Sequence, residues 1–146
     1  MADRHLVDAH LLLVRGEEVL LSRRVDPDPR FDGRWHLPSG KLDAGESVLA
    51  AAAREAREEV GVVIELAALR HVHTLHATGF GVEPRLGLFF EVRRWGGEPV
   101  NREPAKCSEL GWFRLDALPG DAIGYSVAGI EAYRAGTPFA VLGWDS

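Results

Sequence analysis

The chain has 146 residues, of which 46% are hydrophobic and 27% are charged, a composition typical of a globular protein with an apolar core. Its net charge of −5 argues against a protein that binds nucleic-acid polymers, so a phosphate-bearing ligand would need a metal ion or a few focused cations. A single cysteine, Cys107, excludes an internal disulfide and agrees with a reducing compartment. No apolar stretch approaches a membrane span and no secretory signal is present, so we expect a cytoplasmic protein that makes no membrane contact.

The N-terminal quarter predicts a β-hairpin followed by a loop. Residues 6–15 and 19–24 are rich in Leu and Val, and the Gly-Glu-Glu segment between them favours a turn. Two arginines, Arg23 and Arg24, close the second strand, and solvent exposure is the expectation for Arg24. Residues 25–34 contain two prolines, three aspartates and a glycine, which predict a surface loop. A short extended piece, residues 35–38, then leads to Gly40.

Residues 40–62 predict a glycine turn that runs into an alanine-rich helix. Ser47 is the predicted N-cap and Gly61 the predicted C-terminal stop. Residues at three- and four-residue spacing form an apolar stripe that we expect to face the core. This stripe consists of Leu49, Ala52, Ala53, Ala56 and Val60.

Three acids, Glu55, Glu58 and Glu59, fall within an arc of roughly 100° on this helix. Glu55 and Glu59 are four residues apart and repel each other, by about 0.2–0.5 kcal/mol on a helix. They also lie in the last turn, where the helix dipole disfavours negative charge. A bound divalent cation would reverse both effects, and hard carboxylate ligands suit Mg²⁺ or Mn²⁺. A solvated acidic face is the alternative explanation.

The second half of the chain predicts further strands and a final helix. Residues 62–76 contain a strand in which strict alternation would put His71 and His73 on one face and His76 on the other. Residues 85–95 predict a strong strand, residues 112–113 a short one, and residues 121–135 a helix capped by Asp121. We expect the tail, residues 136–146, to be irregular.

The spacing around the acids resembles the signature of the Nudix hydrolases. Gly40 is followed after five residues by Glu46, after seven more by Arg54-Glu55, and then by Glu58-Glu59 and Gly61. Two positions depart from the usual pattern. Ala56 stands where a larger aliphatic residue is common, and Ser39 stands where many members have a second glycine. The resemblance implies an α/β fold, an α/β/α sandwich around a mixed β-sheet, formed by one domain over residues 1–146.

The resemblance also implies a site for Mg²⁺, with Mn²⁺ as an alternative. Its ligands would be the Gly40 carbonyl, Glu55, Glu58, Glu59 and Glu103, of which Glu103 is indicated by similarity to small family members and not by spacing. Glu55 and Glu58 would be catalytic. Glu46, Arg54 and Gly61 would brace the loop and helix. Arg23 would bind substrate phosphate, Lys41 is a candidate for the same contact, and His36 is a candidate contact to the base together with Trp35, Phe80 and Tyr125.

The activity that the resemblance implies is hydrolysis of a diphosphate linkage in a small nucleotide. The short chain and the similarity after Trp95 favour a nucleoside triphosphate, split to monophosphate and pyrophosphate. An ADP-ribose or nucleotide-sugar pyrophosphatase is the alternative enzyme. A Nudix-fold module that binds a nucleotide without turnover is the alternative outside enzymes. Dimers are frequent in the family, so the resemblance also leaves a homodimer open.

Overall fold

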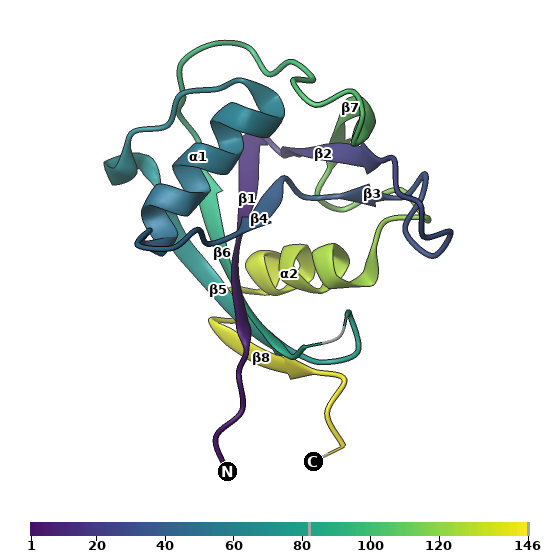
Figure 1. Cartoon of the computed structure of the whole chain (residues 1–146). Helices are drawn as coiled ribbons and strands as arrows, with labels where there is room; N and C mark the ends of the chain where they lie inside the picture. The colour runs from purple at the N-terminus through teal and green to yellow at the C-terminus, as the bar shows by residue number, and fades with distance from the viewer. Residues whose placement is uncertain (82, 146) are drawn as a thin grey trace.

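The computed structural model describes residues 1–81 and 83–145. A mixed β-sheet lies between two helices, so the expected α/β architecture is confirmed (Figure 1). The strands of the sheet run in the order β3-β2-β1-β6-β5-β8, with β4 paired to β1 and β7 paired to β2. Strands β1 and β6 are parallel, as are β5 and β8, and the other pairs are antiparallel.

The elements have the following bounds in chain order. They are β1 Leu6–Arg15, β2 Glu18–Arg24, β3 Trp35–His36, β4 Ser39–Lys41, α1 Val48–Val60, the 3₁₀-helix Leu66–Ala68, β5 Arg70–Ala77, β6 Arg85–Val92, β7 Cys107–Arg114, α2 Gly124–Ala135 and β8 Phe139–Leu142.

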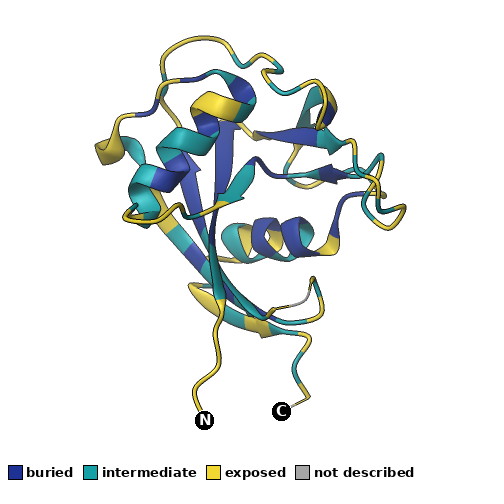
Figure 2. Ribbon diagram, in the orientation of Figure 1, coloured by how far each residue is buried: buried dark blue, intermediate teal, exposed yellow. Residues whose placement is uncertain are grey.

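Both faces of the central strands are buried, and each face supports its own core (Figure 2). In β1, Leu11 and Leu13 join the core beneath α1, whereas Leu12 and Val14 join the core beneath α2. This split follows from the two-residue period of a strand, and burial on both sides explains why the strand reads as a continuous apolar run. By the same alternation, Asp8 lies on the α2 face of the sheet.

The predicted hairpin of β1 and β2 is confirmed, and so is the helix that follows Ser47. The predicted apolar stripe of α1 is only partly right. The buried residues are Ala51, Ala52, Ala56 and Val60, and the larger Leu49 lies at the edge with Ala53. Small side chains at the buried positions let the helix axis approach the sheet.

Two predictions for the C-terminal part were wrong. Helix α2 begins at Gly124 after the N-cap residue Ile123, and Asp121 does not cap it. The tail is not irregular throughout, because Phe139–Leu142 forms β8 and pairs in parallel with β5. The Gly136 residue ends α2 in the left-handed conformation (φ 70°), which turns the chain back toward the sheet.

The prediction that His71 and His73 share a face was also wrong. The register between β5 and β6 shifts at this point, so His71 lies opposite Phe90 and His73 lies opposite Phe89. Their rings contact those two phenylalanines, which belong to different cores. A β-bulge inserts one residue and thereby breaks the strict alternation on which the prediction depended.

Among the residues that the structure describes, no helix combines the length and the apolar character that crossing a membrane requires.

Candidate active site

Helix α1 begins and ends where the sequence predicts. The Ser47 hydroxyl accepts a hydrogen bond from the backbone N–H of Ala50 at 3.1 Å, which satisfies one of the free donors of the first turn. Gly61 adopts φ 71° and its N–H donates to the carbonyl of Arg57 at 3.1 Å. Only glycine adopts this conformation without strain, so the end of the helix is fixed. These caps set the positions of the acids on the helix.

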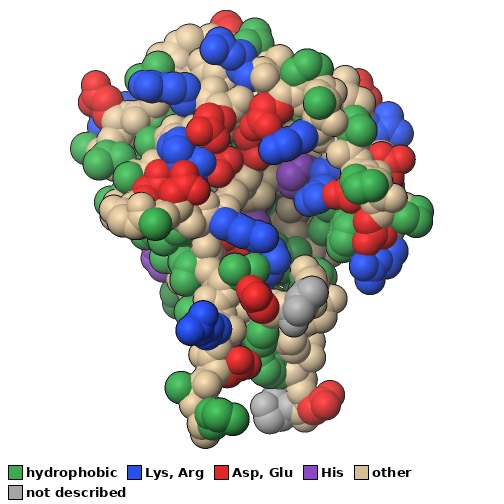
Figure 3. Space-filling model, viewed as in Figure 1, with side chains coloured by type: hydrophobic (Ala, Val, Ile, Leu, Met, Phe, Trp, Pro, Cys, Tyr) green, Lys and Arg blue, Asp and Glu red, His purple; other side chains and the backbone are tan. Residues whose placement is uncertain are grey.

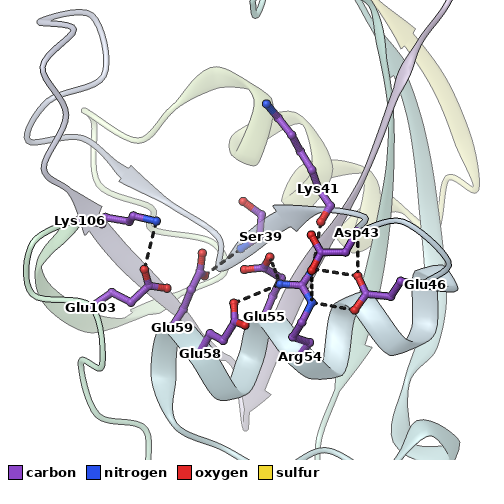
Figure 4. A network of polar contacts seen from close by, with 10 residues as sticks. All are labelled: Ser39, Lys41, Asp43, Glu46, Arg54, Glu55, Glu58, Glu59, Glu103 and Lys106. Carbon is purple, nitrogen blue, oxygen red and sulfur yellow. Dashed lines mark hydrogen bonds and ion pairs between the residues drawn. The ribbon is translucent and has the colours of Figure 1, made fainter.

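Arg54 is the centre of a polar network that joins α1 to the preceding loop (Figure 4). Its guanidinium group contacts Glu46 at 2.7 Å and 2.9 Å, and donates to the carbonyl oxygen of Lys41 at 3.1 Å. It also pairs with Glu55 at 2.8 Å and with Glu58 at 3.1 Å. The hydrogen bonds from Arg54 lower the pKa of Glu46 to about 2. The expected bracing of the loop by Glu46 and Arg54 is therefore present in the geometry.

Two acids of α1 are held in an environment that disfavours their charge. Burial raises the pKa of Glu55, although the hydrogen bond and charge of Arg54 oppose the increase. Burial raises the pKa of Glu59 well above its usual value, and the negative charge of Glu55 adds to the effect. The Glu59 carboxylate accepts one hydrogen bond from the backbone N–H of Ser39 at 3.1 Å. Both carboxylates are thus ionised at neutral pH only at a cost in free energy.

Glu103 joins these acids from the loop that precedes β7. Its negative charge raises the pKa of both Glu55 and Glu59, so its carboxylate lies in their electrostatic field. It forms an ion pair with Lys106 at 3.4 Å (Figure 4). Glu58 is more exposed than its neighbours, with 53% of its side chain accessible. We call Glu55, Glu58, Glu59 and Glu103 the acid cluster.

Gly40 contributes space. It lies within β4 and is not among the glycines with positive φ. A Cβ atom at this position would overlap the carboxyl group of Glu55. The absence of a side chain at Gly40 therefore lets Glu55 pack directly against the β4 backbone.

The acid cluster offers the oxygen ligands that Mg²⁺ and Mn²⁺ prefer. Burial and mutual repulsion disfavour the charges on Glu55 and Glu59, and the space left by Gly40 is filled by a carboxyl group. The residues present therefore fit a divalent cation. In the described ranges, 1–81 and 83–145, no three acidic, histidine or cysteine side chains stand in a ready-made metal-holding arrangement. Glu55 and Glu103 are turned toward Arg54 and Lys106, so binding a cation would require these ion pairs to exchange partners.

Two adjoining cavities lie beside the acid cluster. Figure 3 shows the surface hollowed next to the acidic side chains of this face. The acid-side cavity, of about 400 Å³, is lined by Glu59, Glu103, Lys106 and the loop around Asp26. The α2-side cavity, of about 280 Å³, lies between the sheet and the start of α2. Its lining includes Asp8, His10, Lys41, Phe80, Arg85 and Tyr125. Arg24, His36 and Ser39 line both cavities, so the two form one groove.

The basic residues are arranged differently from the sequence prediction. Arg23 donates to the carbonyl oxygen of Gly33 at 2.9 Å and pairs with Glu109 at 3.2 Å, and it lines neither cavity. Arg24, which we expected to be exposed, lines both cavities and forms an ion pair with Asp26. The two arginines alternate across β2, so a shift of one residue in the prediction selects the wrong face.

Two other predicted contacts lie in the groove. Burial is the main cause that lowers the pKa of His36 to about 3, so its imidazole is neutral at physiological pH. Lys41 lines the α2-side cavity, and its side chain points away from the acid cluster (Figure 4). Sequence reasoning missed Asp8, His10 and Arg85 as candidates. The first two were visible as polar residues at alternating positions in an otherwise apolar strand, a pattern that indicates a polar feature on one face.

Comparison with known proteins identifies the family. The model of the NUDIX domain matches residues 4–128, and the chain therefore belongs to the Nudix hydrolase family. A protein of Mycobacterium tuberculosis (strain CDC 1551 / Oshkosh) named putative 8-oxo-dGTP diphosphatase 2 is 41% identical over 122 residues, covering 71% of this chain and 77% of its own length. The NAD-capped RNA hydrolase NudC of Stutzerimonas stutzeri (strain A1501) is 36% identical over 138 residues, covering 90% of this chain.

The chain spans only 46% of the length of that NudC protein, about half of it. Among solved structures, the MutT NUDIX hydrolase from Burkholderia pseudomallei aligns with a TM-score of 0.79 at 29% identity, covering 89% of this chain and 98% of its own. A NUDIX hydrolase from Nitrosomonas europaea aligns with a TM-score of 0.78 at 19% identity, which supports the fold. The names of the relatives divide between a nucleoside triphosphate and a capped RNA.

Proposed function

We propose that the protein is a Mg²⁺-dependent pyrophosphohydrolase that splits a nucleoside triphosphate into the monophosphate and pyrophosphate. One observation supports this above the others. Burial, with the nearby charge of Glu103 as a lesser cause, raises the pKa of Glu55 and of Glu59 next to a groove that also contains Arg24. Such an arrangement of carboxylates is unfavourable until a cation binds. A phosphate ligand also needs a cation there, because the carboxylates would otherwise repel its negative oxygens.

In this proposal Glu55, Glu59 and Glu103 hold the cation, with the Gly40 carbonyl and Glu58 as further ligands. Mn²⁺ would be an alternative to Mg²⁺, because both are hard cations that prefer oxygen ligands. When bound, the cation offsets the repulsion between the carboxylates and the phosphate oxygens, and it stabilises negative charge on the phosphate in the transition state. Arg54 would then keep its contacts with Glu46 and Lys41 and continue to position the loop.

The chain's own residues would carry out the remaining steps. The side chain of Glu58 is 53% exposed, and its carboxylate would accept a proton from the attacking water, with Glu55 as the second candidate for this step. The water would attack phosphorus directly, so no protein nucleophile is required. The guanidinium of Arg24 replaces that of Arg23 as the proposed phosphate contact, because it lines both cavities. Lys41 would supply a second positive charge.

The choice of a triphosphate rests on the extent of the matches. The relative named for 8-oxo-dGTP is matched over 77% of its length, whereas the NudC relative is matched over 46%. The second candidate is a dinucleotide, ADP-ribose or nucleotide-sugar substrate. The presence of two adjoining cavities favours it, since each cavity would receive one end of such a molecule.

We further propose that β8 completes the Nudix domain, so that one domain spans residues 1–146. The strand adds to the sheet beside β5, beyond the last residue that the family model matches. The buried free thiol of Cys107 agrees with the reducing conditions of the cytoplasm, which is the location we propose.

A substrate panel tests the proposed reaction. Purified protein would be incubated with Mg²⁺ and either nucleoside triphosphates, ADP-ribose, a nucleotide sugar or NAD, and release of pyrophosphate and monophosphate would be measured. We expect pyrophosphate release from triphosphates that EDTA abolishes. Glu59→Gln should lower the rate by roughly 10²–10³-fold, the scale seen when one electrostatic group of an active site is removed.

The matched control is Glu131→Gln, an exposed acid on α2 that pairs with Arg134. This substitution removes the same negative charge at a residue outside the acid cluster, and it should leave the rate unchanged. Turnover of only ADP-ribose, NAD or the nucleotide sugar would reject the triphosphate but keep the acid cluster. Nucleotide binding without turnover of any substrate would favour the binding module over the enzyme.

A further inference from the structure

The floor of the α2-side cavity contains a buried carboxylate whose oxygens are both occupied. The Oδ1 atom of Asp8 contacts His10 Nε2 at 2.7 Å, and the Oδ2 atom accepts from Arg85 at 3.0 Å. The side chains of Asp8 and His10 are only 4% and 6% exposed. Because a carboxylate accepts hydrogen bonds, the Nε2 atom of a neutral His10 carries the proton and its Nδ1 atom is an acceptor.

Three polar atoms on this floor have no hydrogen-bond partner among the residues that the structure describes. They are His10 Nδ1, Arg85 Nε and the Tyr125 hydroxyl, and all three are buried. All three residues line the same cavity. Buried polar atoms without partners are unfavourable and uncommon, so their concentration here points to a ligand that completes them.

The free atoms have a defined hydrogen-bond character. Arg85 Nε can only donate, the Tyr125 hydroxyl can donate or accept, and the Nδ1 atom of a neutral His10 accepts. A ligand that suits Arg85 and a neutral His10 therefore offers a carbonyl oxygen acceptor beside an N–H donor. An amino group at the same place would present N–H donors toward Arg85, which has no acceptor.

The walls of the cavity suit a flat ring. The rings of Phe80 and Tyr125 meet edge to face at 5.4 Å. The ring of His10 packs against those of Phe89 and Tyr125, with centroids 4.5 Å and 4.9 Å away. Aromatic side chains bind bases through their faces and edges. Gly87 makes room for this arrangement, because a Cβ atom there would overlap the Tyr125 hydroxyl.

From these contacts we infer that Asp8, His10 and Arg85 form a recognition site for a keto nucleobase, such as hypoxanthine or uracil, in preference to an amino base. Arg85 donates to the ring carbonyl and His10 accepts from the neighbouring ring N–H. Asp8 is a positioning residue that fixes the orientation of both. This inference rests on the proposed function for the position of the phosphates, which would lie toward Arg24 and the acid cluster.

Binding of monophosphates in EDTA tests the site without metal or turnover. Isothermal titration calorimetry would compare IMP with AMP and UMP with CMP, two pairs that differ chiefly in a keto or an amino group. We expect the keto member of each pair to bind about tenfold more tightly, the scale of one hydrogen bond to a charged donor. Arg85→Met should reduce that preference to less than about threefold, while Arg134→Met, an exposed arginine on α2, should keep it.

The Arg85 variant leaves the Asp8 carboxylate without its cation and can unfold for that reason. The double variant Asp8→Asn with Arg85→Met removes both charges, and circular dichroism would confirm that it is folded before the same titrations. Loss of the keto preference in this variant supports the site as well. Equal binding within each pair by the unaltered protein, preference for the amino base, binding of no monophosphate at millimolar concentration, or an unchanged preference in the folded variants overturns the inference.

The result is separable from the test of the proposed function. Keto preference in EDTA together with no hydrolysis of any triphosphate would keep the recognition site and reject the enzyme. Hydrolysis of triphosphates by a protein without base preference would keep the enzyme and reject the recognition site. Competition by inorganic phosphate alone, as strong as by IMP, would show that the cavity binds an anion and would also overturn the inference.

Discussion

The acid cluster and the floor of the α2-side cavity both bury carboxylates, but they compensate the charge in opposite ways. Asp8 is neutralised within the protein by Arg85 and contacts His10. Glu59 faces Glu55 and Glu103, and a single backbone N–H is its hydrogen-bond donor among the described residues. The charge of Asp8 is therefore compensated within the protein, and the α2-side floor lacks only neutral hydrogen-bond partners. The acid cluster lacks a cation. The comparison indicates which ligand each region receives.

Displacing the Glu55 carboxylate should have the largest effect on the activity of the acid cluster. Gly40→Ala would place a Cβ atom where that carboxyl group lies, and the backbone of β4 cannot withdraw because it pairs with β1. We expect the rate of pyrophosphate release to fall about 100-fold, since a displacement of about 1 Å in a catalytic group costs on that order. Base preference in EDTA should change less than the rate, because the added Cβ atom meets Glu55 and Gly40 lines the α2-side cavity only through its backbone.

Gly120→Ala is the matched control for this change. A Cβ atom at Gly120 meets open space, so its activity and stability should stay close to those of the unaltered protein. A Gly40→Ala enzyme with full activity would contradict the placement of Glu55 in the acid cluster.

A smaller effect should follow from removing the central arginine of the network. Arg54→Met deprives Glu46 and Glu55, whose side chains are only 14% and 12% exposed, of their charged partner. We expect the free energy of unfolding to fall by about 1–3 kcal/mol, as when a buried group loses its hydrogen-bond partner. Urea denaturation in EDTA would measure it. Arg57→Met, an exposed arginine on the same helix, should cost much less, and equal losses would reject the role of Arg54.

The local structure around helix α1 could be predicted well from the sequence, because it depends on residues that are close together in the chain. The caps at Ser47 and Gly61 and the contact between Glu46 and Arg54 all lie within one loop and one helix, where spacing determines geometry. The fold class and the hairpin also followed from periodicity and turn residues. The contact between Gly40 and the Glu55 carboxyl group was not predicted, because it depends on how α1 packs against β4 and not on spacing along the chain.

The other side of the groove could not be predicted, since it depends on contacts between distant segments. Arg85 reaches Asp8 across 77 positions of sequence through parallel pairing of β1 and β6. Arg24 and not Arg23 faces the cavities because of strand register, which the run of two arginines does not reveal. The bulge in β5 likewise separated His71 from His73, and no local signal marked it.

Thermal unfolding as a function of pH, in EDTA and in Mg²⁺, tests the central claim most directly. The pKa of Glu59 is raised in the folded state, so folding is favoured while this group is protonated, and stability is lost as the pH rises from about 4.5 through the folded pKa. The pKa of Glu46 is lowered to about 2, so its contribution is present above about 4.5 and is lost only as the pH falls toward 2.

We therefore predict that the melting temperature in EDTA is highest near about pH 5 and falls toward pH 8. Mg²⁺ should restore it at pH 8 and have little effect at pH 5, because the cation binds the ionised acids. Glu59→Gln should flatten the decline in EDTA and weaken the response to Mg²⁺. The contrary result is a melting temperature in EDTA that stays the same or rises between pH 5 and pH 8 and does not respond to Mg²⁺. That result would contradict an acid cluster whose buried charges are compensated by a bound cation.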